Sequence, residues 1–156
     1  MNHALLDLLR TRHSVKPHML AAPGPGPEQL ELILSIAARV PDHKKLAPWR
    51  FVLFEGEARA RMGEVFAAAC QAEEKEPSAK RLETERGRLM RAPLVVGVIS
   101  VVKPSAGAPE WEQVLSCGAA AFNMCIAANA LGFATGQGVA GLANGQVAQT
   151  GVVENL

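Results

Sequence analysis

The chain has 156 residues, of which 49% are hydrophobic, and its formal net charge at pH 7 is +1. This length and composition predict a single domain, residues 1–156, that is large enough to bury a core. The near-neutral charge gives no general electrostatic reason to expect nucleic acid or a membrane surface as a partner. The chain's three cysteines lack paired short spacing, which argues against a disulfide framework and against a zinc site, so no metal is expected.

The ends of the chain and its apolar runs bear on where the protein resides. No N-terminal stretch combines basic residues with an uninterrupted apolar core and a small-residue cleavage site, so we expect no signal peptide. The apolar runs are interrupted well before membrane-spanning length. Together with the cysteine pattern, this predicts a cytoplasmic protein.

The first segment of interest lies at the N-terminus. Leucines recur within residues 3–10, which predicts a short helix whose apolar side packs inward. The chain then offers Arg12, His13, Ser14 and Lys16 within five positions. A phosphate is bound by such groups, because arginine supplies planar charged donors and serine a neutral one. From these residues alone, a solvated basic turn is the favoured interpretation and a phosphate clamp is the alternative.

A helix, a polar loop and a strand follow between residues 27 and 54. Apolar residues at helical spacing predict a helix that Pro41 ends, and the continuous apolar run at 50–54 predicts a strand covered on both faces. Arg39 and His43 lie in the break between them. Loops fixed by rigid elements commonly carry binding groups. The plainer interpretations are that Arg39 interacts with the carbonyls at the helix end and that His43 is a solvated side chain.

The middle of the chain predicts further helices and a strand. Residues 57–74 have one apolar stripe, in which Cys70 is a packing residue, and residues 73–91 alternate acids and bases as a solvated helical face does. The β-branched run at 94–102 predicts a buried strand. Residues 110–131 form the longest helical pattern, and because they are small or apolar nearly all round, we expect a central helix.

The segment after Phe133 is rich in glycine and weakly patterned. Residues 136–141 match the letters of a dinucleotide-binding glycine motif but follow a helix, so a flexible loop is the favoured interpretation. A serine hydrolase is not indicated, because no serine is flanked by glycines in the Gly-x-Ser-x-Gly pattern.

Two short motifs in register resemble the small FMN-dependent nitroreductase-like family. They are Arg12-His-Ser-x-Lys16 and Arg39-x-Pro-Asp-His-Lys-x-x-x-Pro-Trp-x-Phe51, on a shared order of elements that matches clearly over residues 3–133. This chain has Lys16 where the family more often has arginine, which keeps the charge but loses bidentate geometry. The glycine-rich end departs from the family's strand, helix, strand and wrapping tail, and we expect a short or divergent C-terminus.

The resemblance implies an α+β fold in which helices flank a central sheet, with the long core helix at a dimer interface. In that family the arginine-serine block holds the FMN phosphate and flavin edge, Arg39 contacts the flavin, and His43 reaches the flavin of the opposite subunit. The segment after Phe133 adds contacts to FMN, which makes Gln137 and Gly138 further candidates. The cofactor-binding set is thus Arg12, His13, Ser14, Lys16, Arg39, His43, Gln137 and Gly138. No residue is assigned a catalytic role, because the flavin would carry the chemistry.

The implied activity is transfer of a hydride from NADH or NADPH, through FMN, to an electron-poor small molecule such as a nitro compound or quinone. The implied assembly is a homodimer with a shared flavin site. The alternative is a non-catalytic flavin-binding paralogue that folds around FMN without turnover.

Overall fold

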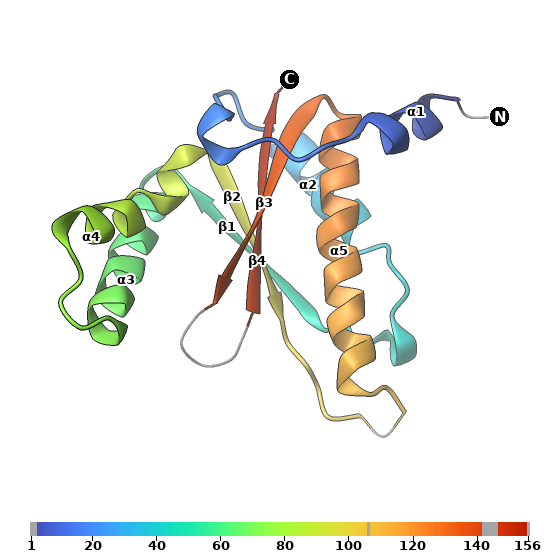
Figure 1. Ribbon diagram of the computed structural model, residues 1–156. Helices are drawn as coiled ribbons and strands as arrows, with labels where there is room; N and C mark the ends of the chain where they lie inside the picture. The colour runs from blue at the N-terminus through green and yellow to red at the C-terminus, as the bar shows by residue number, and fades with distance from the viewer. Residues whose placement is uncertain (1–2, 106, 142–146, 156) are drawn as a thin grey trace.

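The computed structural model describes the backbone of residues 3–105, 107–141 and 147–155, and side chains through residue 136 outside those gaps (Figure 1). The elements in chain order are α1 (His3–Thr11), η1 (Pro17–Met19), α2 (Pro27–Ala37), η2 (His43–Lys45), β1 (Trp49–Glu55), α3 (Glu57–Glu73), α4 (Ala79–Arg86), η3 (Arg88–Arg91), β2 (Leu94–Ser100), α5 (Glu110–Ala130), β3 (Phe133–Gly141) and β4 (Val147–Asn155). The expected α+β class is therefore confirmed.

The four described strands form one antiparallel sheet in the order β1-β2-β4-β3. β2 lies between β1 and β4, with Val52 opposite Gly97 and Gly97 opposite Thr150. The hairpin of β3 and β4 therefore extends the sheet on the side away from β1. This arrangement explains why β2 is the most apolar strand, because it has a neighbour on each side and helices on both faces.

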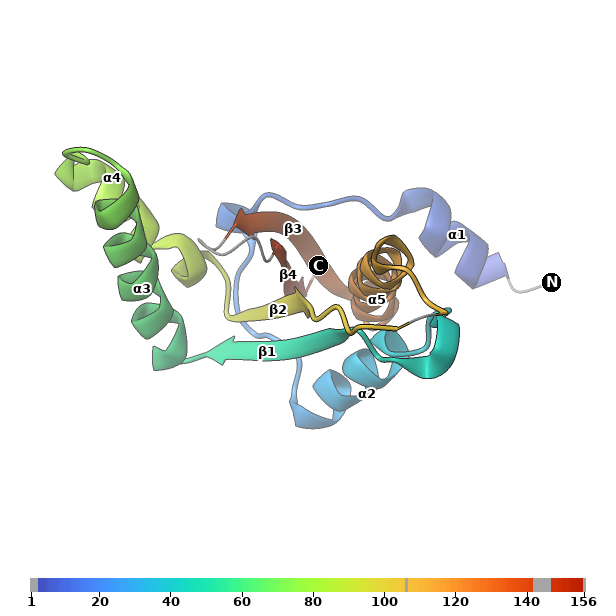
Figure 2. The ribbon, with the colours of Figure 1, turned by 90° about the horizontal axis from the view of Figure 1, so that it is seen from below.

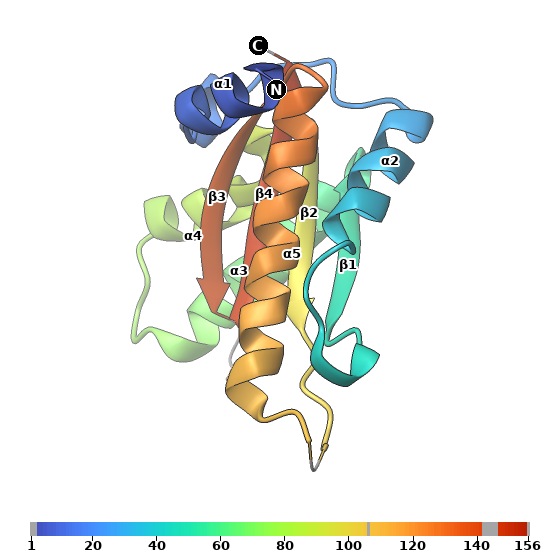
Figure 3. The ribbon, with the colours of Figure 1, turned by 90° about the vertical axis from the view of Figure 1, so that its right-hand side faces the viewer.

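The main core lies between the sheet and the pair α2 and α5 (Figure 3). Leu94, Val96 and Val98 alternate along β2 and point to these helices, and each is at most 2% exposed. They meet Ile33 of α2 and Met124 of α5, both fully buried. The two-residue period of a strand and the helical stripe of α2 thus converge on one apolar layer.

A second core lies on the opposite face of the sheet. Val95 points away from α5 and packs with Leu20, Phe66 of α3 and Leu89 of η3. From here α3 and α4 project away from α5, as Figure 2 shows. Gly63 allows α3 and α4 to approach closely, because a Cβ there would lie 2.1 Å from the carbonyl oxygen of Arg86.

Three expectations from the sequence were wrong. α1 does not pack inward, because none of its residues is buried. β1 is not covered on both faces, because its residues are half-buried or exposed, and it is also an edge strand of the sheet. The glycine-rich segment, including residues 136–141, is strand β3 rather than a flexible loop, because its backbone pairs with β4 whatever its side chains are.

The long helix α5 is central, as expected, but one side is uncovered. Trp111, Leu115 and Phe122 are 62%, 64% and 51% exposed, respectively, while Cys117, Ala121 and Met124 are buried. Large apolar groups on a continuous exposed helix face are typical of an interaction surface. Among the described helices, none is both long and apolar enough to cross a membrane.

Candidate functional site

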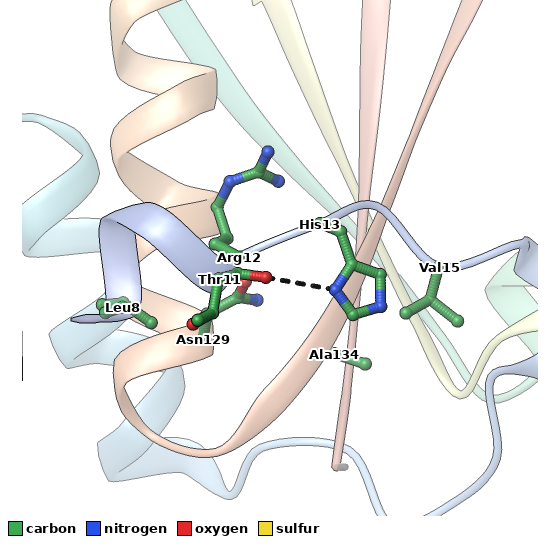
Figure 4. A pocket seen from close by; sticks show the side chains of 7 residues that line it. All are labelled: Leu8, Thr11, Arg12, His13, Val15, Asn129 and Ala134. Carbon is green, nitrogen blue, oxygen red and sulfur yellow. Dashed lines mark hydrogen bonds between the residues drawn. The ribbon is translucent and has the colours of Figure 1, made fainter.

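The N-terminal basic segment borders a hollow at the C-terminal end of α5. Thr11, Arg12 and His13 line it together with Leu8, Val15, Asn129 and Ala134, and its volume is about 260 Å³ (Figure 4). His13 Nδ1 donates to the carbonyl oxygen of Thr11 at 3.3 Å. In Figure 4 the Arg12 side chain extends away from the His13 ring, which lies beside Val15 and Ala134.

The position of this segment is fixed by β3. The Val15 backbone nitrogen donates to the Thr135 carbonyl at 2.9 Å. Gly136 lies directly beneath, since a Cβ at that position would be only 2.6 Å from the Val15 carbonyl oxygen. The absence of a side chain at residue 136 therefore allows the basic segment to lie on the strand.

Ser14 and Lys16 lie beside the hollow rather than on its wall. Both side chains are exposed, and Lys16 precedes the η1 turn. Of the expected Arg12, His13, Ser14 and Lys16 cluster, the structure thus brings the first two to the hollow and leaves the other two facing outward.

Cations in this region lack acidic partners. Within the described part of the chain, Arg12, Lys16 and Arg39 form no ion pair, whereas four arginines of α3, α4 and η3 pair with glutamates, namely Arg61, Arg81, Arg86 and Arg88. The Arg12 guanidinium lies 5.7 Å from the centre of the Phe122 ring on α5. Stacking holds the charge in place without neutralising it. These groups therefore remain free to bind an anion.

The loop that carries Arg39 and His43 runs along α5, with Arg39 beside the middle of the helix and His43 beside its first turn. Asn123 Nδ2 donates to the Arg39 carbonyl at 3.2 Å, and His43 Nδ1 donates to Glu112 Oε2 at 2.7 Å. Glu112 lies seventeen residues before Asn129, which borders the Arg12 hollow. By helix rise this is about 25 Å. The Arg12 guanidinium lies nearer, at Phe122, ten residues or about 15 Å of helix rise from Glu112, so Arg12 and His43 occupy separate places along α5 within one chain.

Gln137 and Gly138 lie in β3, where their backbones pair with Gly151 and Thr150. The side chain of Gln137 is outside the described residues. Their place on the strand that supports Val15 brings their backbone to the same edge of the molecule as the basic segment.

Sequence reasoning missed two polar residues of α5. Asn129 Nδ2 donates to the Phe133 carbonyl at 2.8 Å and to the Thr135 hydroxyl at 3.1 Å, so it fixes the start of β3 beside the hollow. The signal was an amide in an alanine-rich helix. Glu112 carried a weaker signal, because acidic residues are ordinary in the first turn of a helix.

The three cysteines are free and buried. Burial raises the pKa of the Cys70, Cys117 and Cys125 thiols, so they remain protonated near neutral pH. Cys70 lies on the buried face of α3, as its place on the apolar stripe predicted.

The fold and site define a class of protein: an antiparallel α+β domain with unpaired cations at a sheet edge and a long helix that exposes an apolar face. The profile of the Nitroreductase family matches residues 9–147. The Haemophilus influenzae protein named "Putative NAD(P)H nitroreductase" is 40% identical over 129 residues, which are 82% of this chain and 68% of that protein. The chain belongs to the nitroreductase family.

Solved structures share the fold. A nitroreductase-like family protein from Bacillus cereus superposes with a TM-score of 0.80 at 20% identity, covering 97% of this chain and 85% of that one. The FMN-dependent nitroreductase NfnB from Mycobacterium smegmatis, solved in complex with NADPH, gives a TM-score of 0.68 at 15% identity and covers 98% and 87%.

Proposed function

We propose that this protein is an FMN-dependent oxidoreductase that transfers a hydride from NADH or NADPH to an electron-poor small molecule, such as a nitro compound or quinone. The observation that carries the proposal is that three cations of the expected cofactor-binding set, Arg12, Lys16 and Arg39, have no acidic partner among the described residues. An unpaired cation beside a hollow favours an anionic ligand. The cofactor of a family relative, FMN, carries such an anion.

The residues present fit the phosphate and ribityl part of FMN. Arg12 supplies planar charged donors at the hollow, and the exposed Ser14 and Lys16 lie next along the chain. The hollow of about 260 Å³ is smaller than the usual 300–1,000 Å³ of a ligand site. It suits part of a flavin nucleotide, and the remainder would lie outside this hollow.

A shared site explains why the predicted flavin residues are divided. The Arg12 guanidinium lies beside the middle of α5, at Phe122, and His43 lies beside its first turn, at Glu112, about 15 Å away by helix rise, so the two do not meet within one chain. A two-fold dimer with antiparallel α5 helices would bring Arg12 of one chain toward the partner's loop, in an isologous interface. The exposed Trp111, Leu115 and Phe122 offer the apolar surface that this packing requires.

The protein's own part in the reaction would be binding, orientation and shielding. When bound, FMN supplies the hydride-transfer chemistry. Arg12, Ser14 and Lys16 would hold the phosphate side. Arg39 and His43 of the opposite chain would lie near the ring system, where a cation or donor stabilises negative charge. Gln137 and Gly138 would contribute contacts from the β3 edge.

The test is the absorbance spectrum of the freshly purified protein, followed by titration of flavin-free protein with FMN, FAD and riboflavin. We expect a yellow protein, or uptake of FMN in preference to the other two. Colourless protein that ignores added FMN would refute the flavin proposal.

Turnover separates an enzyme from a flavin-binding paralogue. The flavin-loaded protein should oxidise NADH or NADPH when a nitroaromatic compound or a quinone is present. A protein that binds FMN tightly yet leaves both nucleotides unoxidised with every acceptor would instead be the non-catalytic paralogue.

A further inference from the structure

A row of polar side chains on α5 forms hydrogen bonds with the loop between α2 and β1. Ser116 Oγ donates to the Pro41 carbonyl at 2.9 Å. Seven residues further along α5, Asn123 Nδ2 donates to the carbonyl of Ile36 in the last turn of α2 at 3.1 Å and to that of Arg39 in the loop at 3.2 Å. Glu112, one turn before Ser116, completes the row by accepting from His43. Spacings of four and seven residues put all three side chains on one face of the helix.

The backbone around His43 is fixed separately from its ring. The Ala47 nitrogen donates to Asp42 Oδ2 at 2.7 Å, and the Lys45 nitrogen donates to the Asp42 carbonyl at 3.1 Å. Lys44, Lys45 and Ala47 all have positive φ, a costly conformation for residues other than glycine. Asp42 therefore holds the turn in shape. Among the described residues, the contact recorded for the imidazole itself is with Glu112.

We infer that Glu112 is a positioning residue that sets the orientation and tautomer of the His43 ring for the flavin of a partner chain. This inference rests on the proposed function. The side chains of His43 and Glu112 are 54% and 29% exposed, and a pair so exposed adds little to stability. The contact instead fixes the orientation of the imidazole ring, because it holds one ring nitrogen against a residue of α5.

The chemistry of the pair selects one tautomer. An ionised carboxylate only accepts hydrogen bonds, so Nδ1 of His43 carries the proton in the 2.7 Å contact. In the neutral ring, Nε2 is then an unprotonated acceptor on the opposite edge. It can accept from a flavin N–H, and on protonation it becomes a donor. Without Glu112, the ring would be free to rotate and to exchange tautomers.

The first arm of the test needs no flavin. NMR spectra that detect two-bond ¹⁵N–¹H couplings report the tautomer of His43. They are recorded on flavin-free protein labelled at its histidines, at pH about 8.5, where an ordinary imidazole is neutral. His43→Gln assigns its signal. We expect the Nδ1–H form in the wild type and in Glu112→Gln, whose amide oxygen still accepts. Glu112→Ala should shift the ring toward the Nε2–H form.

The matched control is Glu110→Gln. Glu110 lies in the same first turn of α5, is exposed and forms no ion pair within the described residues, so it tests the general effect of charge at a helix N-terminus. We expect it to leave the His43 tautomer unchanged. A wild type in the Nε2–H form, or a tautomer that does not respond to Glu112→Ala, would overturn the inference.

The second arm measures FMN binding. Glu112→Ala should raise the Kd about three- to tenfold, and Glu112→Gln should restore most of the affinity. In a His43→Gln background, Glu112→Ala should have no further effect, because Glu112 acts through His43. Equal Kd values for wild type and Glu112→Ala would overturn the inference alone. A wild type that binds no FMN would overturn the proposed function itself, and the inference with it.

Discussion

Arg12 both contacts the long helix α5 and borders the hollow. Its guanidinium rests near the Phe122 ring of α5 and its chain borders the hollow beside β3, while no described carboxylate neutralises it. A stacked arginine loses little further freedom when it binds an anion, since its planar group is already oriented. Arg12 is therefore the strongest candidate for a direct phosphate contact.

We predict that Arg12→Ala weakens FMN binding by about 1.5–3 kcal/mol, roughly ten- to a hundredfold in Kd, because a charge-assisted hydrogen bond is lost. Riboflavin lacks the phosphate, so its binding should change far less. Fluorescence titration of both flavins measures the difference.

Arg10→Ala is the matched control for this substitution. Arg10 lies in the last turn of α1, is exposed and does not line the hollow, so its substitution removes the same charge without altering the hollow. It should leave both affinities nearly unchanged. Equal losses of FMN and riboflavin in Arg12→Ala would show that Arg12 acts on the ring or on folding instead of on the phosphate.

At the scale of elements, α4 depends on a buried carboxylate. Glu85 is 3% exposed and accepts from Arg81 and from Arg88 Nη2, the latter at 2.5 Å, while Arg81 also pairs with Glu74 at 2.8 Å. Burial alone would raise the pKa of Glu85, but the hydrogen bonds from the two arginines outweigh it and the pKa is lowered. The cluster ties α3, α4 and η3 together where few apolar side chains are buried.

We predict that Glu85→Gln lowers the free energy of unfolding by about 1.5–3 kcal/mol at pH 7, since charged hydrogen bonds are lost. The lowered folded pKa means that this stabilisation is complete above the unfolded value, about 4.3, and is lost as the pH falls through the folded pKa. Urea unfolding between pH 3 and 7 should show the gap between wild type and variant closing in acid.

Glu83→Gln provides the comparison for Glu85. Glu83 is in the same helix but exposed, and it forms no ion pair within the described residues. It should change stability by less than about 0.5 kcal/mol. A Glu85→Gln deficit that stays constant down to pH 3 would contradict the assignment of the effect to the ionised carboxylate.

The sequence predicts an element reliably where the spacing of its hydrophobic residues shows which face is buried. Leu94, Val96 and Val98 alternate, and Ile33 recurs with its helical neighbours, so β2 and α2 were foreseen. The sequence also predicts β1 as a strand, but the cover of its faces depends on which helices pack against the sheet, and no local pattern shows that. The β3–β4 hairpin was missed because backbone pairing leaves no mark in a glycine-rich sequence.

The same distinction holds for the site. That Arg12 and His13 lie at the same hollow could be anticipated because they are adjacent in sequence, while their role toward a flavin stays a prediction from the family resemblance. The contact of His43 with Glu112 spans 69 positions, and that of Asn123 with Ile36 spans 87. Neither pairing follows from a local pattern, since only the packing of α2 against α5 brings the partners together.

At the scale of the whole molecule, α1 and α5 expose a large apolar surface. The exposed large side chains of α1 and α5 are Leu5, Leu6, Leu9, Trp111, Val114, Leu115 and Phe122. α1 contributes no buried residue, yet it is amphipathic. A second chain would bury these groups and at the same time bring Arg12 and His43 to one site, so assembly and cofactor binding should be linked.

We predict that FMN shifts the protein from monomer toward dimer. If each flavin is held by Arg12 of one chain and His43 of the other, FMN binds the dimer better than the monomer, and mass action then requires added FMN to favour dimer. Sedimentation velocity at several protein concentrations, with and without FMN, measures the shift. A substitution on α5 tests the same interface. Leu115→Glu places a charge on the exposed face of α5 and should therefore weaken both dimer formation and FMN binding. The control is Leu32→Glu, at an exposed leucine of α2, which should leave dimer formation and FMN binding intact. A protein that remains monomeric while fully loaded with FMN would refute the shared site, because His43 could not then reach the flavin bound near Arg12.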